Sequence, residues 1–252
     1  MKLRTLLATA ALSAVAFSMP ARAQDEAPKD QTKGAYVTIG AGGSWASNPS
    51  FNYSNTSNGV TENTNGSIEL GGGVAVEGGL GYDFGNNVRA ELTYTYNSFS
   101  IGTTTTDSGR ITAPGFADIQ YNATANTSGT ASKNSVLASA YYDIPTKSKF
   151  TPYVGAGLGW VGISIPDQNY TLTGTVQGFG PASVGGLSLP GGSASAFGYQ
   201  AKVGVSYAAA KSTDLFVEGT YAGNTSVTIG DISLGALNNF GARAGVRFRF
   251  GS

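Results

Sequence analysis

The sequence predicts an all-β fold, an eight-stranded antiparallel up-and-down transmembrane β-barrel, from three observations. Eight segments alternate apolar with polar or small side chains, the connections between them alternate short and long, and glycine recurs on the polar face. Because successive side chains of a strand point to opposite faces, each segment has one apolar and one polar face. No helical segment is available to cover the apolar faces, so we expect them to look outward from a closed barrel.

The N-terminus has the pattern of an export signal. A start with two basic residues precedes the apolar run Leu6–Phe17, and Ala21-Arg22-Ala23 fits the small-residue cleavage pattern. The apolar run is too short to cross a bilayer as a helix. We therefore expect three regions: a signal peptide over residues 1–23, a flexible periplasmic lead over 24–33, and the barrel over 34–252.

Composition restricts the partners and the chemistry. Of the 15 basic residues, Lys2, Arg4 and Arg22 leave with the signal, so 12 remain against 15 acidic residues, a net charge near −3. Nucleic acid is therefore not an expected partner. The chain contains no histidine and no cysteine, which removes the usual base of hydrolytic triads and the usual ligands of transition metals. We expect no catalytic residue, no metal and no cofactor.

The first four strands are expected at about residues 35–45, 68–84, 88–96 and 136–144. The first three have clear outward sets. That of the first strand is Ala35, Val37, Ile39, Ala41 and Trp45, and that of the third is Val88, Ala90, Leu92, Tyr94 and Tyr96. That of the second strand is Ile68, Leu70, Gly72, Val74, Val76, Gly78, Leu80, Tyr82 and Phe84. Their inward faces carry glycine, threonine and charged residues. The fourth is less regular, because Leu137 and Tyr141 share the side of Asp143.

The last four strands are expected at about residues 150–161, 197–207, 214–221 and 239–250. Gly155, Gly157 and Gly159 fall on the inward face of the fifth, where a narrow interior needs small side chains. The eighth alternates almost without error, with an arginine-and-glycine inward face and an apolar outward set of Phe240, Ala242, Ala244, Val246, Phe248 and Phe250.

The connections predict which end of the barrel is which. Short turns are expected at residues 85–87, 145–149 and 208–212, and long connections rich in Asn, Thr, Ser and Gly at 46–67, 97–135, 162–196 and 222–238. Short periplasmic turns alternating with long external loops is the outer-membrane topology. We expect the long connections to be solvated loops with a few aromatic residues able to anchor a partner: Phe51, Tyr53, Phe116, Tyr121, Tyr170 and Phe179.

Aromatic residues near the strand ends predict two interfacial girdles, formed by Trp45, Tyr82, Phe84, Tyr96, Tyr142, Trp160, Tyr207, Tyr221 and Phe250. The alternative is a soluble eight-stranded ligand carrier of the lipocalin kind, with the aromatics in its core and the charges outside. The recurrent glycines on the charged face argue against the carrier, since on a solvated exterior they would only weaken the strands.

Charged side chains on the inward faces predict a cluster inside the barrel: Glu69, Glu77, Arg89, Glu91, Lys202, Glu218, Arg243, Arg247 and Arg249. An eight-stranded interior is just wide enough for side chains to fill, so these charges are expected to pair. We interpret the cluster as a structural ion-pair plug. The alternative is a polar path that conducts small solutes.

Several strand motifs resemble those of the opacity-protein and outer-membrane β-barrel surface-antigen family. They are the segment from Thr151 to Gly159 (TPYVGAGLG), Ala140-Tyr141-Tyr142-Asp143, the segment from Gly198 to Val205, and Val217-Glu218-Gly219-Thr220-Tyr221. The resemblance covers the strands of about residues 34–250 and leaves the long connections unmatched. It implies an eight-stranded barrel in the outer membrane of a Gram-negative bacterium. Unlike the usual family pattern, the last aromatic, Phe250, is followed by Gly251-Ser252.

These observations predict a non-enzymatic outer-membrane protein, a structural component or surface antigen. A loop-mediated adhesin and a small pore for polar solutes are the alternatives. The expected partners are outer-membrane lipid and, through the long loops, a host or matrix surface. We expect a monomer.

Overall fold

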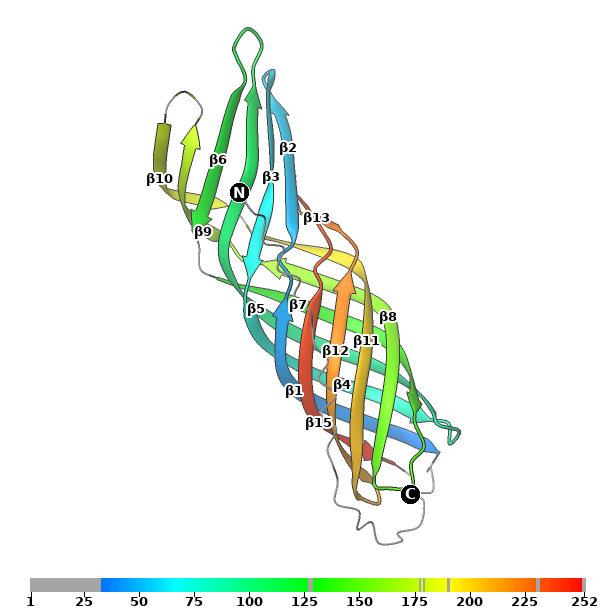
Figure 1. Ribbon diagram of the computed structural model, residues 1–252. Coiled ribbons are helices and arrows are strands. Elements are labelled where there is room, and N and C mark those ends of the chain that lie inside the picture. The colour runs from blue at the N-terminus through cyan, green and yellow to red at the C-terminus, as the bar shows by residue number, and fades with distance from the viewer. Residues whose placement is uncertain are drawn as a thin grey trace, which may run out of the picture.

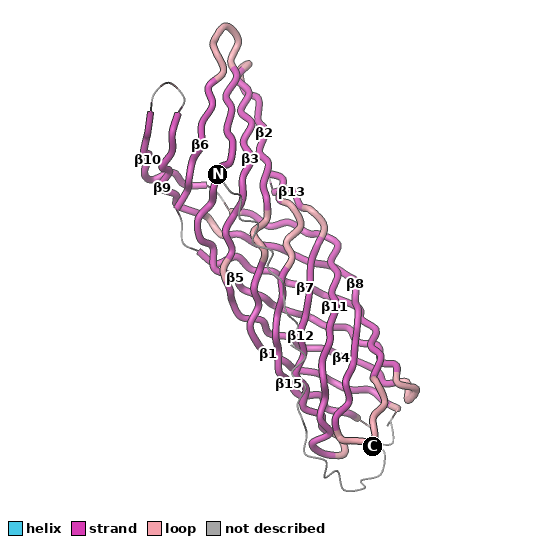
Figure 2. The backbone as a smooth tube through the Cα atoms, viewed as in Figure 1, coloured by secondary structure: helices cyan, strands magenta, loops and turns pink. Residues whose placement is uncertain are grey.

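The computed structural model describes residues 33–126, 129–176, 178, 180–189, 191–229 and 232–250. The expected signal peptide, nearly all of the periplasmic lead and Gly251-Ser252 lie outside the described residues. The described chain forms one antiparallel sheet of 15 strands, of which eight close into a ring. Figures 1 and 2 show an inclined barrel from which several strands continue beyond one end as a sheet.

The ring confirms the predicted fold class. Its members, in sequence order, are β1 (Gly34–Ala46), β4 (Gly72–Asp83), β5 (Val88–Thr112), β7 (Gly129–Asp143), β8 (Phe150–Ile165), β11 (Gly192–Ala210), β12 (Thr213–Asn224) and β15 (Asn239–Arg249). Each pairs antiparallel with the next, and β15 pairs with β1 from Tyr36↔Arg249 to Ala46↔Asn239, which closes the barrel. Closure leaves the ring without a free edge.

The two faces of the ring strands are as the alternation predicts. The outward apolar side chains are exposed, for example Ile39, Leu80, Val203 and Phe240, whereas the inward charged side chains of the same strands are buried. Of the nine predicted girdle aromatics, all but Tyr221 are exposed. The soluble-carrier alternative is therefore wrong, because it requires the apolar residues inside and the charges outside.

The short turns lie at the end of the barrel where the ring begins and ends. The amide of Phe250 donates to the carbonyl of Ala35 at 2.8 Å, and the turn between β4 and β5 is tight, with positive φ at Gly85 and Asn87. The opposite end carries all the long connections. In an outer-membrane barrel, this second end faces the cell exterior.

The prediction of solvated loops at the external end is wrong for most of their length. The long connections contain the remaining strands: β2 (Ser50–Ser57), β3 (Val60–Leu70), β6 (Ile119–Asn126), β9 (Gln168–Val176), β10 (Gly180–Leu189), β13 (Val227–Ile229) and β14 (Ile232–Leu234). With the outer part of β5, strands β2, β3, β6, β9 and β10 form the external sheet (Figure 1).

Polar pairs between strands explain why a composition typical of loops forms this sheet. The hydroxyl of Ser54 donates to Asn63 Oδ1 at 2.8 Å, the hydroxyl of Ser108 donates to Asn65 Oδ1 at 3.1 Å, and the hydroxyls of Thr56 and Thr61 lie 2.9 Å apart. Such cross-strand pairs contribute to sheet stability without an apolar face. Strand β5 has 25 residues, so one continuous strand belongs to both the barrel and the external sheet.

The strand predicted over residues 68–84 is interrupted at Gly71, which separates β3 from β4. The pairing with β5 is irregular there: Leu70 lies opposite Ile101, and the amide of Gly71 donates to the carbonyl of Ser100. An extra residue moves every preceding side chain to the other face. Ile68 and Leu70, predicted outward, therefore point into the barrel mouth, and Glu69, predicted inward, is exposed.

Candidate functional site

Four of the predicted charged residues meet in the middle of the barrel. Glu77 of β4, Lys202 of β11, Glu218 of β12 and Arg243 of β15 form what we call the central quartet, and each is at most 4 % exposed. Glu218 and Arg243 are direct partners in the β12–β15 register, whereas Glu77 reaches the others across the interior. Alternation thus directs all four inward, and closure of the barrel brings them together.

The central quartet is tightly paired. Lys202 Nζ lies 2.5 Å from Glu77 Oε1 and 3.1 Å from Glu218 Oε1, and Arg243 Nη1 lies 2.5 Å from Glu77 Oε2 and 3.9 Å from Glu218 Oε1. The hydroxyl of Thr95 donates to Glu77 Oε2 at 2.8 Å, and that of Tyr153 donates to Glu218 Oε2 at 2.9 Å. Both carboxylates therefore have cationic and hydroxyl partners, as buried charges require.

Arg89 lies nearer the periplasmic end and forms the most specific ion pair. Its Nε and Nη2 donate to the two carboxylate oxygens of Asp143 at 2.8 and 2.9 Å. The guanidinium lies 5.7, 4.7 and 5.2 Å from the ring centroids of Tyr36, Tyr141 and Tyr153. A planar cation between aromatic rings, bonded at two points to a carboxylate, fits arginine much better than lysine.

Glycine makes room for these rings. A Cβ at Gly81 would lie 2.1 Å from Cζ of Tyr36, and one at Gly155 would lie 2.2 Å from Cδ1 of Tyr141. Gly81, Gly155 and Gly204 therefore allow tyrosine rings of neighbouring strands to lie across the interior, whereas Gly157 and Gly159 face Ser139 and the carbonyl of Val136. In both cases the inward face has no room for a Cβ.

A second ion-pair group closes the periplasmic end. Arg249 Nη1 donates to Asp83 Oδ2 at 2.8 Å, and its Nε donates to Asp214 Oδ2 at 2.9 Å. Arg247 Nη1 lies 3.6 Å from the same Asp214 oxygen. Glu91 lies between the groups and accepts a hydrogen bond from the hydroxyl of Tyr141 at 3.3 Å. A small cavity beside Glu91 and Arg247 has a volume of about 10 Å³, close to the room that one water molecule needs.

The structure places eight of the nine predicted residues in the interior and excludes Glu69 for the reason given above. The prediction did not include three further carboxylates, Asp83, Asp143 and Asp214, which pair with its arginines. The alternation could have predicted two of them, since it places Asp83 and Asp214 on the inward face. Lys133 was also missed, because its position was assigned to a loop.

Above the central quartet, a polar layer and an apolar cluster complete the filling. Lys133 Nζ donates to Asn239 Oδ1 at 3.0 Å and to the carbonyl of Leu237 at 3.2 Å, and Asn239 Nδ2 donates to Ser44 Oγ at 2.9 Å. Over this layer lies the mouth cluster, defined by the buried side chains of Val161, Ile163, Val227, Leu234 and Leu237. Buried side chains therefore extend from the central quartet to the external mouth.

The external sheet has its own polar contacts. The hydroxyl of Tyr121 donates to Glu62 Oε1 at 2.6 Å and lies 2.7 Å from Thr64 Oγ1; partial burial, with the neighbouring carboxylate, raises the pKa of Tyr121 to about 12. Arg110 forms an ion pair with Asp118, and the hydrogen bonds from Arg110 lower the pKa of that carboxyl group. Phe116, at the tip of the β5–β6 hairpin, is 78 % exposed.

Within the ranges that the structure describes, no group of three or more His, Cys, Asp or Glu side chains could hold a metal ion. Nor does any helix there have the length and hydropathy needed to cross a membrane. The arrangement of paired charges can stabilise a closed fold.

A closed antiparallel ring with an apolar belt outside and paired charges inside defines an outer-membrane β-barrel protein. Over residues 9–249 the chain matches the family of the outer membrane protein beta-barrel domain. The chain belongs to this family and is a protein of the outer membrane of Gram-negative bacteria.

Two relatives and two solved structures illustrate what the chain is similar to. Uncharacterized proteins of Brucella suis and Brucella melitensis are 34 % identical over 93 residues, which is 36 % of this chain and 33 % of their own length. The crystal structure of Neisserial surface protein A is 22 % identical, with 86 % of this chain and 97 % of that chain covered and a TM-score of 0.46. The crystal structure of OprG from Pseudomonas aeruginosa is 12 % identical, with 89 % of this chain and 100 % of that chain covered and a TM-score of 0.39.

Proposed function

We propose that this protein is a non-conducting, non-enzymatic outer-membrane barrel that anchors the external sheet at the cell surface. The observation that carries the proposal is the filled interior: the central quartet, the Arg89–Asp143 pair and the Arg249 pairs cross the interior, and the mouth cluster covers them. In this proposal the charge cluster is structural, because Glu77 links β4 to β11 and β15, and Arg249 links β15 to β4 across the interior.

The outer surface supports a lipid-embedded anchor. The exposed apolar side chains form a belt between two sets of aromatics, with Trp45, Trp160, Phe197 and Phe240 towards the exterior and Tyr82, Phe84, Tyr142, Phe150, Tyr207 and Phe250 towards the short turns. Aromatic residues at these two levels are typical of the membrane interfaces. We infer that the belt contacts lipid acyl chains.

Planar-bilayer recording tests the closed barrel. We expect purified protein, folded in detergent and added to a bilayer, to give no stable conductance steps, while a porin added to the same membrane gives them. Insertion is verified independently by co-sedimentation with vesicles of the same lipid. Stable steps of porin size from the inserted protein would refute a structural plug and support the pore alternative.

A second candidate function is adhesion through the external sheet. It is favoured by the exposed ring of Phe116 at the tip of the β5–β6 hairpin, since exposed aromatics are typical binding anchors. The external segments carry Glu62, Glu69, Asp107, Asp118, Asp167 and Asp231 but few basic residues, so a polyanionic partner is not favoured.

Adherence of whole bacteria to epithelial monolayers tests this second function. Cells that display Phe116→Ser are expected to adhere less than cells with the wild-type protein, at equal surface amounts. Phe84→Ser, in a short turn at the opposite end, is the matched control and should adhere normally once its insertion is verified. Unchanged adherence of the Phe116 variant would exclude this anchor.

A further inference from the structure

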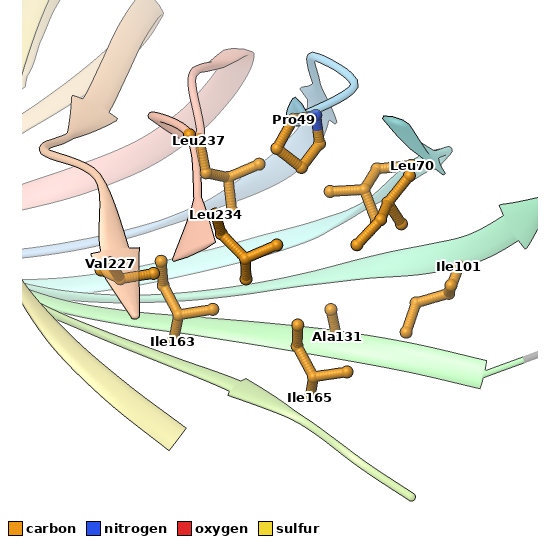
Figure 3. A pocket seen from close by; sticks show the side chains of 11 residues that line it. Pro49, Leu70, Ile101, Ala131, Ile163, Ile165, Val227, Leu234 and Leu237 are labelled. Atoms are coloured by element: carbon orange, nitrogen blue, oxygen red, sulfur yellow. The ribbon is translucent and has the colours of Figure 1, made fainter. Parts of the chain in front are cut away.

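The external mouth of the barrel contains a narrow apolar pocket. It is lined by Pro49, Ile68, Leu70, Ile101, Ala131, Ile163, Ile165, Val227, Leu234, Gly235 and Leu237. Figure 3 shows Leu234 and Leu237 facing Ile163, Ile165 and Ala131 across the space. Its enclosed volume is about 40 Å³, and about 520 Å³ when the part open to solvent is included.

A buried cation lies directly beneath this pocket. Lys133 is 1 % exposed, and it follows Ala131 on the same inward face of β7. Its register partner across β7–β8 is Ile163, and its hydrogen-bond acceptor at 3.2 Å is the carbonyl of Leu237. Two residues that line the pocket therefore also contact or flank the ammonium group.

The ammonium of Lys133 is paired differently from the other interior cations. Among the described residues no carboxylate lies within ion-pair distance of it, and its acceptors are the neutral oxygens of Leu237 and Asn239. The neighbouring Asn97, opposite Lys133 in the β5–β7 register, has a buried Oδ1 without a hydrogen-bond partner. A buried ammonium normally has an anionic partner, because neutral oxygens compensate only part of its lost hydration.

We propose that the mouth pocket binds a single-chain carboxylate amphiphile, such as a long-chain fatty acid, from the external medium. The carboxylate bonds to Lys133 in place of the Leu237 carbonyl, and the alkyl chain lies between β8 and the β13–β14 hairpin. The apolar walls select the chain and the buried cation selects the anionic head group. A phosphate or sulfate head group needs more donors than this floor presents.

The β13–β14 hairpin is the wall that must move to admit the chain. It has three register pairs within itself and three with β2, from Ile232↔Tyr53 to Leu234↔Phe51. The ring strands that form the opposite wall are held by much longer ladders, for example from Gly192↔Ile165 to Tyr207↔Phe150 between β11 and β8. Outward displacement of the hairpin widens the pocket without disturbing the barrel or the central quartet, so the ligand is held and not conducted.

Photo-crosslinking in lipid nanodiscs tests the proposal. The probe is palmitic acid with a diazirine in its alkyl chain, and the comparison probe is the alcohol of the same length with the same diazirine. After illumination, labelled residues are mapped by mass spectrometry. We expect the acid to label the walls formed by β7, β8 and β13–β14, and the alcohol to label them about tenfold less.

Lys133→Gln is expected to reduce labelling of the pocket by the acid about tenfold, to the level of the alcohol. Lys147→Gln, in an exposed periplasmic turn, is the matched control and should label as the wild type does. Folding of each variant is checked by heat-modifiable gel migration. If Lys133→Gln does not fold, Leu234→Trp fills the pocket while Lys133 stays in place, and it should abolish the labelling.

Three outcomes would overturn the proposal. The first is equal labelling of the pocket by the acid and the alcohol. The second is labelling of the outward apolar belt alone by the acid. The third is labelling of the pocket that survives both Lys133→Gln and Leu234→Trp. A closed barrel that fails to bind the acid still gives no conductance, so failure of this proposal is distinguishable from failure of the proposed function.

Discussion

Replacing Glu77 by glutamine removes the anionic centre of the central quartet without changing its shape. In the wild type, Glu77 lies 2.5 Å from both Lys202 Nζ and Arg243 Nη1 and accepts the hydroxyl of Thr95. After Glu77→Gln, Lys202 keeps Glu218 at 3.1 Å, but the nearest remaining carboxylate of Arg243 in the quartet is 3.9 Å away. One buried cation is therefore left largely uncompensated.

The size of the effect follows from this pairing. Breaking a buried ion pair by removing one partner destabilises a protein by about 3–5 kcal/mol. Because Lys202 retains a carboxylate and the glutamine keeps one acceptor oxygen, we expect the lower end, about 3 kcal/mol. That corresponds to roughly a hundredfold decrease in the equilibrium constant for folding.

Reversible urea unfolding in lipid vesicles measures the free energy of unfolding, followed by the fluorescence of the outward-facing Trp45 and Trp160. Glu69→Gln is the matched control, because Glu69 is exposed on β3, and its effect should stay within about 0.5 kcal/mol. If Glu77→Gln and Glu69→Gln unfold at the same urea concentration with the same slope, the interior charges do not hold the barrel together and the structural interpretation is wrong.

Three further substitutions test other parts of the structure. Arg89→Lys keeps the charge but loses the two-point bond to Asp143 and the aromatic stacking, so we expect a loss of about 1–3 kcal/mol in the same unfolding assay, and an unchanged midpoint would contradict this. Gly155→Ala places a Cβ 2.2 Å from Tyr141, so we expect it to lower the free energy of unfolding by about 1–3 kcal/mol. Gly219→Ala is the control and should be tolerated, because the nearest atom to its Cβ lies 3.8 Å away. Equal stability of the two variants would argue against the close-approach explanation. Val246→Arg introduces a charge into the outward belt, at a free-energy cost of roughly 2–4 kcal/mol for a site near the membrane midplane, and should lower the folding yield in lipid vesicles. Val246→Leu is the control and should fold as well as the wild type. An equal yield for the arginine variant would count against lipid contact there.

The sequence alone determined the eight ring strands, the inward and outward faces of all but the fourth, and the order of short and long connections. It could do so because the side-chain period of a strand is 2, so a single alternating segment such as Phe240 to Phe250 specifies which residues share a face. It also placed Glu77, Lys202, Glu218 and Arg243 inside, because the polar faces of all strands in a closed transmembrane ring point into the same interior.

Only the tertiary structure decided which of these residues meet. Register and closure set Arg89 against Asp143 and Arg249 against Asp83, residues far apart in the chain whose pairing no local pattern encodes. The register irregularity at Gly71 reversed the faces of Ile68, Glu69 and Leu70, because a shift of one residue moves every side chain beyond it to the opposite face.

The external sheet was missed for a related reason. The segments of β2, β3 and β6 are rich in Asn, Thr and Ser, a composition that strands and solvated loops share when no apolar face is required. What makes them strands is pairing with one another and with the outer part of β5, which continues from the barrel. Lys133 shows the same dependence: its position in the chain predicted a loop, and only the closed mouth above it makes it a buried cation.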